Sequence, residues 1–327
     1  MKAVVVTCQG GPETLEYVDV PEPVPADDEL LVQVRAVGLN YHDIYNRAGV
    51  YAYEVPFVPG RELAGTVAAV GAAVRGYAVG DPVATADVPR PGAYVERVVV
   101  PADRVVPVPA GISLEVAAAV LLQGLTADYL CRLTYPVQPG DVAVVHAAAG
   151  GTGLLLTQMV KERGGRVIAT VSTPDKVDLV RRMGAEEVIC RSSEDFDKEV
   201  HRMTDGRGAA VVYDSIGRAT FEQSLASLGR RGHLVLYGKS SGTVPSHDLH
   251  EFGYRGSLSV HVPMLPDYIA SNEELTAASD RVFEQVQRGT LHVHIGGRFP
   301  LREARAAHEA LESQRTKGKL LLMPRRG

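Results

Sequence analysis

A glycine-rich turn is the segment of this sequence best suited to chemistry. Residues 141–171 read DVAVVHAAAGGTGLLLTQMVKERGGRVIATV, and the turn within them runs Ala148-Ala149-Gly150-Gly151-Thr152-Gly153. This A-x-G-x-x-G pattern is the dinucleotide-binding fingerprint with Ala148 in place of the first glycine. Gly150 lets the backbone approach a pyrophosphate, Gly153 lets the helix pack on the strand, and the helix N-terminus offers N–H groups. Since a strand precedes the turn and a helix and strand follow, we predict nucleotide binding, the alternative being an unliganded turn.

The residues after the next two strands indicate which nucleotide binds. NAD-binding folds usually place Asp or Glu roughly 20 residues after the glycines, at the end of the second strand. Here the strand Arg166–Val171 ends at Ser172, Lys176 follows closely, and Arg191 ends the next strand. Hydroxyl groups and cations suit a 2′-phosphate, so the pattern favours NADPH over NADH. A solvated helix face and turn are the alternative for the two cations.

A second segment, VPGRELAG at residues 58–65, places Arg61 and Glu62 side by side where an apolar run begins. Its simplest interpretation is a solvated turn, and its sharper one is a functional pair. The three cysteines, Cys8, Cys131 and Cys190, are far apart and form no C-x-x-C pair. We therefore expect no disulfide framework and a cytoplasmic location.

Composition narrows the class of protein further. The chain has 327 residues, of which 45% are hydrophobic and 22% charged, with a formal net charge of −5. These values are typical of a soluble globular protein of one or two domains and do not favour nucleic-acid binding. We find no signal peptide and no stretch approaching the roughly 20 apolar residues of a membrane span, and so expect no membrane partner.

The hydrophobic patterning predicts two kinds of domain. The first part carries β-rich runs between turn-forming segments and predicts a barrel. A helix is predicted from Ser113, and alternating strands and helices from Gly140 on predict a parallel sheet. The predicted barrel strands are Lys2–Thr7, Glu29–Val37, Leu63–Val70 and Ala93–Val100, and the predicted sheet strands are Val142–Ala147, Arg166–Val171, Glu187–Cys190, Ala209–Asp214, His233–Tyr237 and Leu258–Val262. Two helices and the strand LLLMP are expected after Pro266.

Segments along the whole chain resemble the zinc-independent medium-chain dehydrogenases/reductases, and specifically the NADPH:quinone oxidoreductases of the zeta-crystallin type. They include VGLNYHDIYNRAGVY, VPGRELAGTV, LLQGLTADYL, HAAAGGTGLLL, VVYDSIGRATFEQSL, RRGHLVLYGKSSG and AHEALESQRTKGKLLL. The resemblance implies an α/β fold with a Rossmann doubly wound parallel sheet plus a GroES-like β-barrel domain. We expect the GroES-like catalytic domain at 1–120, completed by 264–327, and the Rossmann NADP-binding domain at 121–263.

The same resemblance implies site residues. In the more distantly similar zinc alcohol dehydrogenases, zinc ligands stand at the positions of Asn40 and Arg61, which cannot form a tetrahedral zinc site, so no metal is expected. Arg61 and Glu62 are then interpreted as an ion pair left at a former metal position. Asn40 and Tyr45, with Tyr51 as a weaker candidate, resemble residues near the nicotinamide and substrate. Thr126 resembles a threonine that touches the nicotinamide, or else bonds to its own helix backbone.

Three further cofactor contacts follow from strand ends, and a fourth from the C-terminal segment. Gly217 and Gly238 end consecutive parallel strands, where such sheets bind ligands, and Ser240 follows Gly238. Ser240 and Lys319 are candidate cofactor contacts or plain turn residues. The sequence departs from the resemblance at Arg191, where close relatives have a tyrosine, and also at Gln314 and at Val262-Pro263.

The predicted function is reduction of quinones by zinc-free hydride or electron transfer from NADPH. The alternatives are an enone, alkenal or enoyl reductase of the same family, and a non-enzymatic NADPH-binding protein of the crystallin type. The expected partner is a small quinone or enone substrate. By resemblance alone we expect a homodimer through the Rossmann domain, by pairing of the edge strand in GSLSVHV.

Overall fold

The computed structural model describes residues 1–88 and 92–324 and divides the chain into two compact units. The barrel unit comprises Met1–Leu122, Ser271–Gly289 and Val293–Gly327, and the Rossmann unit comprises Gln123–Ala270 and Thr290–His292. The chain therefore leaves the barrel unit, builds the Rossmann unit and then returns. The barrel unit is therefore assembled from segments that lie far apart in the sequence.

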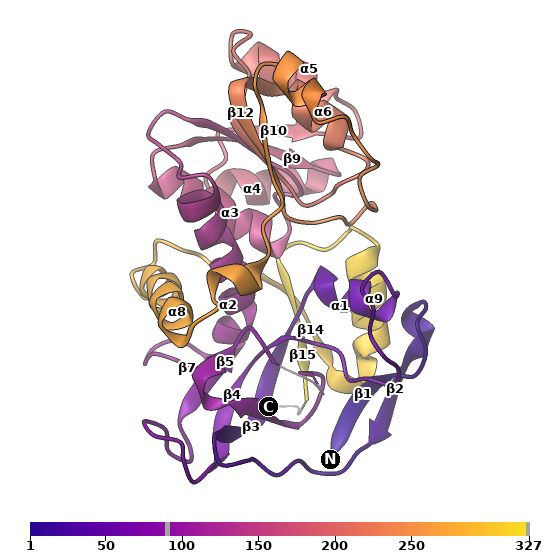
Figure 1. Cartoon of the computed structure of the whole chain (residues 1–327), viewed down its shortest axis with the longest axis vertical. Helices are drawn as coiled ribbons and strands as arrows, with labels where there is room; N and C mark the ends of the chain where they lie inside the picture. Colours follow the sequence, from indigo (N-terminus) through magenta and orange to yellow (C-terminus); the bar gives the residue numbers. More distant parts are fainter. Residues whose placement is uncertain (89–91, 325–327) are drawn as a thin grey trace. The chain divides into compact units, whose positions relative to one another are not determined.

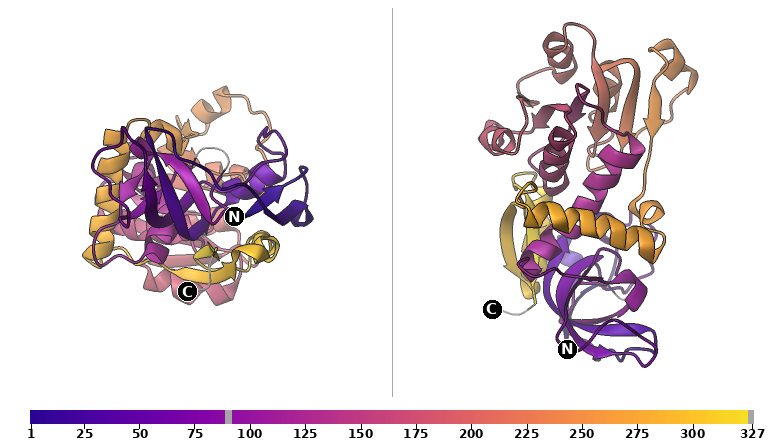
Figure 2. Two further views of the ribbon diagram at one scale, coloured as in Figure 1. Left: turned by 90° about the horizontal axis from the view of Figure 1, so that it is seen from below. Right: turned by 90° about the vertical axis from the view of Figure 1, so that its left-hand side faces the viewer.

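The barrel unit contains a curved sheet of mostly antiparallel strands (Figure 2). Its strand order is β14-β15-β3-β4-β5-β7, with β6 paired to β3, and β1 and β2 form a separate antiparallel pair. Valine and leucine dominate β3 and β15, as expected for half-buried and buried strands. The bounds are β1 Lys2–Val6, β2 Leu15–Asp19, β3 Glu29–Leu39, β4 Glu62–Val70, β5 Pro82–Thr85, β6 Arg97–Pro101, β7 Val106–Pro107, β14 Ile295–Pro300 and β15 Lys319–Met323.

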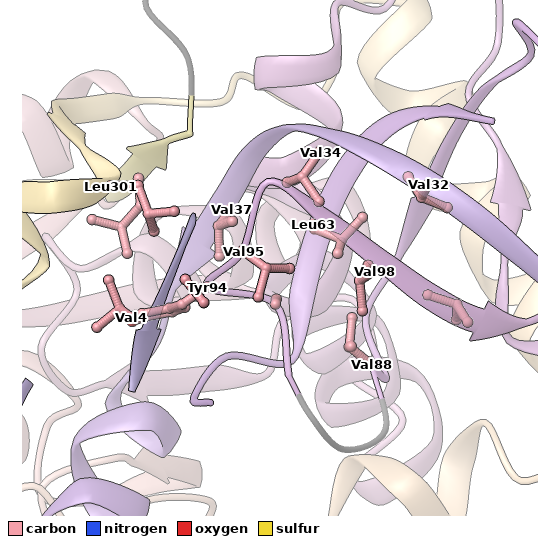
Figure 3. Close-up of a cluster of buried hydrophobic side chains, with 14 of the residues drawn as sticks. Val4, Val32, Val34, Val37, Leu63, Val88, Tyr94, Val95, Val98 and Leu301 are labelled. Atoms are coloured by element: carbon pink, nitrogen blue, oxygen red, sulfur yellow. The ribbon is translucent and has the colours of Figure 1, made fainter. Parts of the chain in front are cut away.

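An apolar cluster lies in the core of the barrel unit (Figure 3). Val32, Val34 and Val37 of β3 meet Leu63 of β4 there, and Val4 of β1 lies in the same cluster. Burying each such side chain stabilises the fold by about 1.5–3 kcal/mol. The cluster also takes in Leu301, next to the C-terminal helix α9, so the returning segment is part of this core.

Among the described residues, four α-helices contribute to the barrel unit: α1 Tyr41–Arg47, the first part of α2 Leu114–Tyr129, α8 Asn272–Gln287 and α9 Ala304–Glu312. The start of α8 is set by a capping box. The Ser271 hydroxyl accepts from the backbone N–H of Glu274, and the Glu274 carboxylate accepts from the backbone N–H of Ser271. Local sequence thus fixes where the returning segment turns helical.

The Rossmann unit is built on six parallel strands in the order β10-β9-β8-β11-β12-β13. Strands β9, β10 and β12 of this sheet are labelled in Figure 1. In order of appearance along the chain this is 3-2-1-4-5-6, the doubly wound dinucleotide-binding order. Right-handed crossovers place α3 and α4 on one face and α5 and α6 on the other. The bounds are β8 Val142–Val145, α3 Gly151–Glu162, β9 Arg166–Val171, α4 Val177–Arg182, β10 Glu187–Cys190, α5 Phe196–Met203, β11 Ala209–Asp214, α6 Phe221–Ala226, β12 Leu228–Leu236, α7 His250–Tyr254 and β13 Ser259–His261.

The predicted strands agree best where the sheet is most buried. β9, β10 and β11 have the predicted bounds, whereas β8 ends at Val145 because the backbone at Ala147 has already turned, with φ 47°. In the barrel unit the predicted strand Ala93–Val100 is wrong in its first half, since β6 begins at Arg97. The short strands β2 and β5 and the glycine-containing β14 were not predicted.

The expectation that no segment is long and apolar enough to span a membrane needs correction. Among the described residues, Leu114–Thr134 is one such helical segment, with 21 residues and a mean hydropathy of 1.3. It consists of α2 and the π-helix Leu130–Thr134 that continues it. However, 61% of its most apolar window is buried inside the structure, and the core helix of a soluble protein passes the same test, so the finding is weak evidence for a span.

Candidate functional site

The glycine turn lies at the carboxyl end of β8, the central strand of the Rossmann unit beside the point where strand order reverses. Gly150 caps α3 in an extended conformation, and its N–H donates to Ala147 O (2.9 Å). A Cβ on Gly153 would lie 2.6 Å from Ala147 O and 2.7 Å from Ala148 Cα, so only glycine permits this packing of helix on turn. Ala149 is buried in the turn, and Thr152 lies in the first turn of α3. The first N–H groups of the helix have no partner within it, which suits a phosphate.

Two cations lie at the ends of the next two strands. Lys176 is buried, and its Nζ donates to Ser172 Oγ (3.0 Å), so the structure brings these two predicted residues together. Arg191 follows β10, and its backbone N–H donates to Val171 O of β9 (3.0 Å). Its Nε is buried without a hydrogen-bond partner among the described residues, and burial lowers the pKa of its guanidinium. A donor in that state fits a phosphate group.

The loops after β11 and β12 lie against each other. Asp214 Oδ1 accepts from the backbone N–H groups of Ile216 (2.7 Å) and Gly217 (3.0 Å), which fixes the first loop. A Cβ on Gly217 would lie 2.8 Å from Gly242 O, and one on Gly238 would lie 2.6 Å from Ser215 O. The N–H of Ser240 donates to Ser215 O (3.3 Å). Gly217, Gly238 and Ser240 therefore share one edge of the sheet with the glycine turn.

A buried histidine supports this edge and was not predicted. His146 Nε2 contacts Ser224 Oγ (3.0 Å), and Nδ1 contacts Thr170 Oγ1 (2.8 Å). Because Ser224 donates to Asp214 Oδ2 (2.8 Å), its oxygen must accept from His146, which assigns the proton to Nε2. Burial lowers the pKa of His146 to about 4, so it is neutral at neutral pH. A histidine directly after an apolar strand was the only sequence signal. Thr126, the remaining predicted cofactor residue of this unit, is buried on α2.

In the barrel unit, Asn40, Glu62 and Lys319 form a buried cluster. Lys319 Nζ donates to Glu62 Oε2 (2.6 Å) and to Asn40 Oδ1 (2.8 Å). Asn40 Nδ2 donates to Gly38 O and to Glu62 Oε2, both at 3.0 Å, so both of its N–H bonds are used. Glu62 Oε1 accepts from the backbone N–H of Leu122 (2.7 Å). A Cβ on Gly38 would overlap the Glu62 carboxylate, so glycine there makes room for it.

One expectation is corrected by this cluster. Arg61 and Glu62 do not pair with each other: Arg61 forms an ion pair with Asp87, and Glu62 pairs with Lys319. The ammonium group of Lys319, a predicted cofactor contact, is buried between Asn40 and Glu62, with its side chain 1% exposed. The Lys319 ammonium group thus lies between Asn40 and the carboxylate of Glu62. Asn40 stands at one of the two positions that correspond to zinc ligands in the zinc alcohol dehydrogenases, and Glu62 directly follows the other, Arg61.

Aromatic side chains gather on and after α1. The rings of Tyr45 and Tyr51 meet edge to face with centroids 5.7 Å apart, and His42 lies 5.2 Å from Tyr51. Burial, with a further contribution from Arg61, lowers the pKa of His42 to about 4. Its Nε2 is buried without a hydrogen-bond partner among the described residues. Burial also raises the pKa of Tyr51, which keeps its hydroxyl protonated.

A second buried polar chain of the barrel unit was also missed. Tyr94 OH donates to Asp43 Oδ2 (3.2 Å) and contacts His308 Nε2 (2.9 Å). His308 Nδ1 contacts Arg47 Nη1 (3.0 Å), and Arg47 pairs with Glu312 (2.7 Å). Asp43 Oδ2 also accepts from the backbone N–H of Asn40 (2.9 Å), so this chain ends at a predicted site residue. No local pattern in the sequence predicts these contacts.

Within residues 1–88 and 92–324, no group of three or more His, Cys, Asp or Glu side chains could hold a metal ion.

Family models match both units. The model described as the alcohol dehydrogenase GroES-like domain matches residues 26–110, and the model described as zinc-binding dehydrogenase matches residues 151–277. A GroES-like domain and a Rossmann domain in one chain define the medium-chain dehydrogenases/reductases.

Full-length relatives narrow this class. The chain is 43% identical to a quinone oxidoreductase of Pseudomonas aeruginosa over 99% of both chains, and 37% identical to a 2-haloacrylate reductase of a Burkholderia species over 98% of both. The solved structure of an Escherichia coli quinone oxidoreductase complexed with NADPH superposes with a TM-score of 0.97, at 40% identity, covering 99% of this chain and 100% of that one. The chain therefore belongs to the zinc-independent quinone oxidoreductase family of medium-chain dehydrogenases/reductases.

Proposed function

We propose that this protein reduces quinones with NADPH. One observation carries the proposal: 43% identity over 99% of both chains to a quinone oxidoreductase. The residues at the carboxyl edge of the Rossmann sheet fit the cofactor. Gly150–Gly153 and the start of α3 would hold the pyrophosphate, and Ser172, Lys176 and Arg191 would hold the 2′-phosphate. Thr126, Ala149, Gly217, Gly238 and Ser240 would contact the rest of the dinucleotide. When bound, NADPH supplies a hydride from its nicotinamide ring.

We further propose that residues on and after α1 contact the acceptor. Asn40 has both amide N–H bonds engaged with Gly38 and Glu62, so it serves as a fixed wall of the site rather than as a donor to substrate. Tyr51 keeps its proton at neutral pH, and His42 is neutral with a buried Nε2. These two groups are the candidates to form a hydrogen bond with an acceptor oxygen as charge develops on it. Tyr45, packed edge to face on Tyr51, orients that ring.

A second acceptor class is favoured by a specific observation. The 2-haloacrylate reductase of Burkholderia has an activated carbon–carbon double bond in its named substrate, and this chain is 37% identical to it. An enone or acrylate would need the same hydride and the same donor for its carbonyl oxygen. Reduction of such acceptors is the alternative function.

The proposal is tested by steady-state oxidation of NADPH and NADH with a panel of acceptors after treatment with a chelator. The panel contains 1,4-benzoquinone, 9,10-phenanthrenequinone, an enone, 2-chloroacrylate and an enoyl thioester. We expect NADPH-preferring turnover of the quinones that resists chelation. Turnover of the enone or acrylate alone would establish the alternative. Tight NADPH binding with no turnover of any acceptor would instead indicate a cofactor-binding protein.

We also propose a cytoplasmic homodimer. The described cysteines, Cys8, Cys131 and Cys190, are free thiols, which suits a reducing compartment. β13 is the edge strand of the Rossmann sheet and is available for pairing with a second copy. Sedimentation velocity of the full chain gives the oligomeric state.

A further inference from the structure

The buried hydrogen bonds that lead from Arg47 through His308 and Tyr94 to Asp43 can be donated in only one direction. Arginine only donates hydrogen bonds, so His308 Nδ1 accepts from Arg47 Nη1 (3.0 Å). The proton of the neutral imidazole is then on Nε2, which donates to Tyr94 OH (2.9 Å). Tyr94 has one hydroxyl proton, and it goes to Asp43 Oδ2 (3.2 Å). Burial and Arg47 lower the pKa of His308 to about 3, so the ring is neutral, as this assignment requires.

Asp43 receives this chain on one carboxyl oxygen. Oδ2 accepts from Tyr94 OH and from the backbone N–H of Asn40, whereas Oδ1 is buried without a partner among the described residues. A proton on Oδ1 therefore leaves both hydrogen bonds to Oδ2 in place. Burial raises the pKa of Asp43 to about 7, opposed by its two hydrogen bonds and by the charge of Lys319 and reinforced by Glu62. The contacts of Asp43 thus persist in both protonation states.

The position of Asp43 makes these contacts relevant to the site. It lies in the first turn of α1, three residues after Asn40, and its carboxylate closes that turn onto the backbone of Asn40. Asn40 is held from the other side by Lys319 and Glu62. Tyr94, from the loop before β6, donates to Asp43, and the charges of Glu62 on β4 and Lys319 on β15 act on it. His308 on α9 acts on Asp43 only through Tyr94.

We propose that Asp43 is a positioning residue of the reductase site, and that the directed chain from Arg47 through His308 and Tyr94 holds its carboxyl group so that Asn40 and the start of α1 keep one orientation. The inference rests on the proposed function for its catalytic consequence. Its structural part, the fixing of Asn40, stands apart from that function. The C-terminal helix α9 therefore contributes to the site through His308 without touching substrate.

The experiment compares Tyr94→Phe with the matched control Tyr77→Phe. Tyr77 lies in the same unit and donates to Val105 O (2.7 Å), away from this chain of residues. Two readouts are taken on the full-length protein: hydrogen exchange of the Asn40 amide by NMR, and kcat and KM for 1,4-benzoquinone across pH 5–9. The NADPH dissociation constant is measured by fluorescence.

We expect Tyr94→Phe to speed hydrogen exchange at the backbone N–H of Asn40. We also expect it to lower kcat by about two- to tenfold, which corresponds to the loss of one hydrogen bond. The pH profile of kcat should shift, and the NADPH dissociation constant should stay within about twofold, while Tyr77→Phe matches the wild type in every readout. His308→Gln, which keeps one donor and one acceptor, should retain more activity than His308→Leu. Asp43→Asn, which keeps the accepting oxygen, should likewise retain more than Asp43→Ala.

Unchanged Asn40 exchange together with an unchanged kcat and pH profile in Tyr94→Phe would overturn the proposal, whatever happens to the melting temperature. If the wild type reduces no quinone, the proposed function fails, and the exchange data alone then decide whether Tyr94 and Asp43 fix Asn40. The two failures are therefore distinguishable.

Discussion

Lys319 Nζ lies 2.6 Å from Glu62 Oε2, and the two side chains are 1% and 0% exposed. The carboxylate has further donors in Asn40 and the backbone of Leu122, so both of its oxygens accept hydrogen bonds. Such a pair compensates the desolvation of its charges only while both partners are present.

Replacing Lys319 by Met should therefore destabilise the protein strongly. The change leaves the Glu62 carboxylate buried without a countercharge, and the expected loss is about 3–5 kcal/mol in the free energy of unfolding. Urea denaturation measures it. The exposed pair of Lys198 and Asp195 provides the control, since Lys198→Met should cost less than about 1 kcal/mol. Adding Glu62→Gln to Lys319→Met should restore much of the loss, and no recovery would argue against an uncompensated charge as the cause.

Arg191→Ala should weaken NADPH binding without affecting NADH. A guanidinium that binds a phosphate supplies charge-assisted hydrogen bonds, and their loss corresponds to about 10- to 100-fold in the dissociation constant. Fluorescence titration of both nucleotides measures the change. Arg202→Ala, at an exposed position on α5, should change neither affinity. Equal weakening for NADPH and NADH would contradict a 2′-phosphate contact.

Gly153→Ala should disturb the nucleotide turn. The added Cβ would lie 2.6 Å from Ala147 O, so α3 must move away from the turn. We expect a lower melting temperature and weaker binding of NADPH and NADH alike. Gly253→Ala is the matched control, because nothing lies within 4 Å of a Cβ there. A variant Gly153→Ala with normal affinity for both nucleotides would remove this turn from the binding site.

The buried histidines predict a loss of stability in acid. His146 titrates near pH 4 in the folded protein instead of at its ordinary 6.5, so the unfolded chain binds more protons in this range. The stability that the neutral, buried His146 contributes to the fold is complete above about pH 6.5 and disappears as the pH falls toward 4. His146→Gln cannot ionise, and the stability gap between wild type and this variant should narrow over that range in urea titrations. A gap that stays constant between pH 6.5 and 4 would contradict the assignment to His146.

Local pattern was sufficient for three strands of the Rossmann unit. β9, β10 and β11 are short apolar runs bounded by polar residues, and their bounds were predicted as found. The glycine turn was likewise readable, because its spacing reflects the close approach that Gly153 makes to Ala147. Parallel strands then bring Ser172, Arg191 and Gly217 to one edge without further information.

Local patterns could not predict the contacts of the site residues in the barrel unit. Arg61 and Glu62 are adjacent, which suggested a pair, but neighbouring residues entering a strand point to opposite faces. The true partner of Glu62 is 257 residues away, and the contact between Arg47 and His308 spans 261. No local pattern predicts that Lys319 is buried. A lysine is rarely buried without a partner, and the partner of Lys319 is distant in the sequence. Long-range contacts of this kind follow from topology rather than from spacing.

The return of the chain to the barrel unit also sets an order of events during biosynthesis. Lys319 is synthesised 257 residues after Glu62. Domains generally fold as units, N-terminal first, during synthesis. For this chain that route leaves the Glu62 carboxylate without its countercharge until the segment after the Rossmann unit has been made. A nascent chain stalled after the Rossmann unit would therefore present an unfinished barrel to chaperones and proteases, however well its nucleotide-binding half had formed.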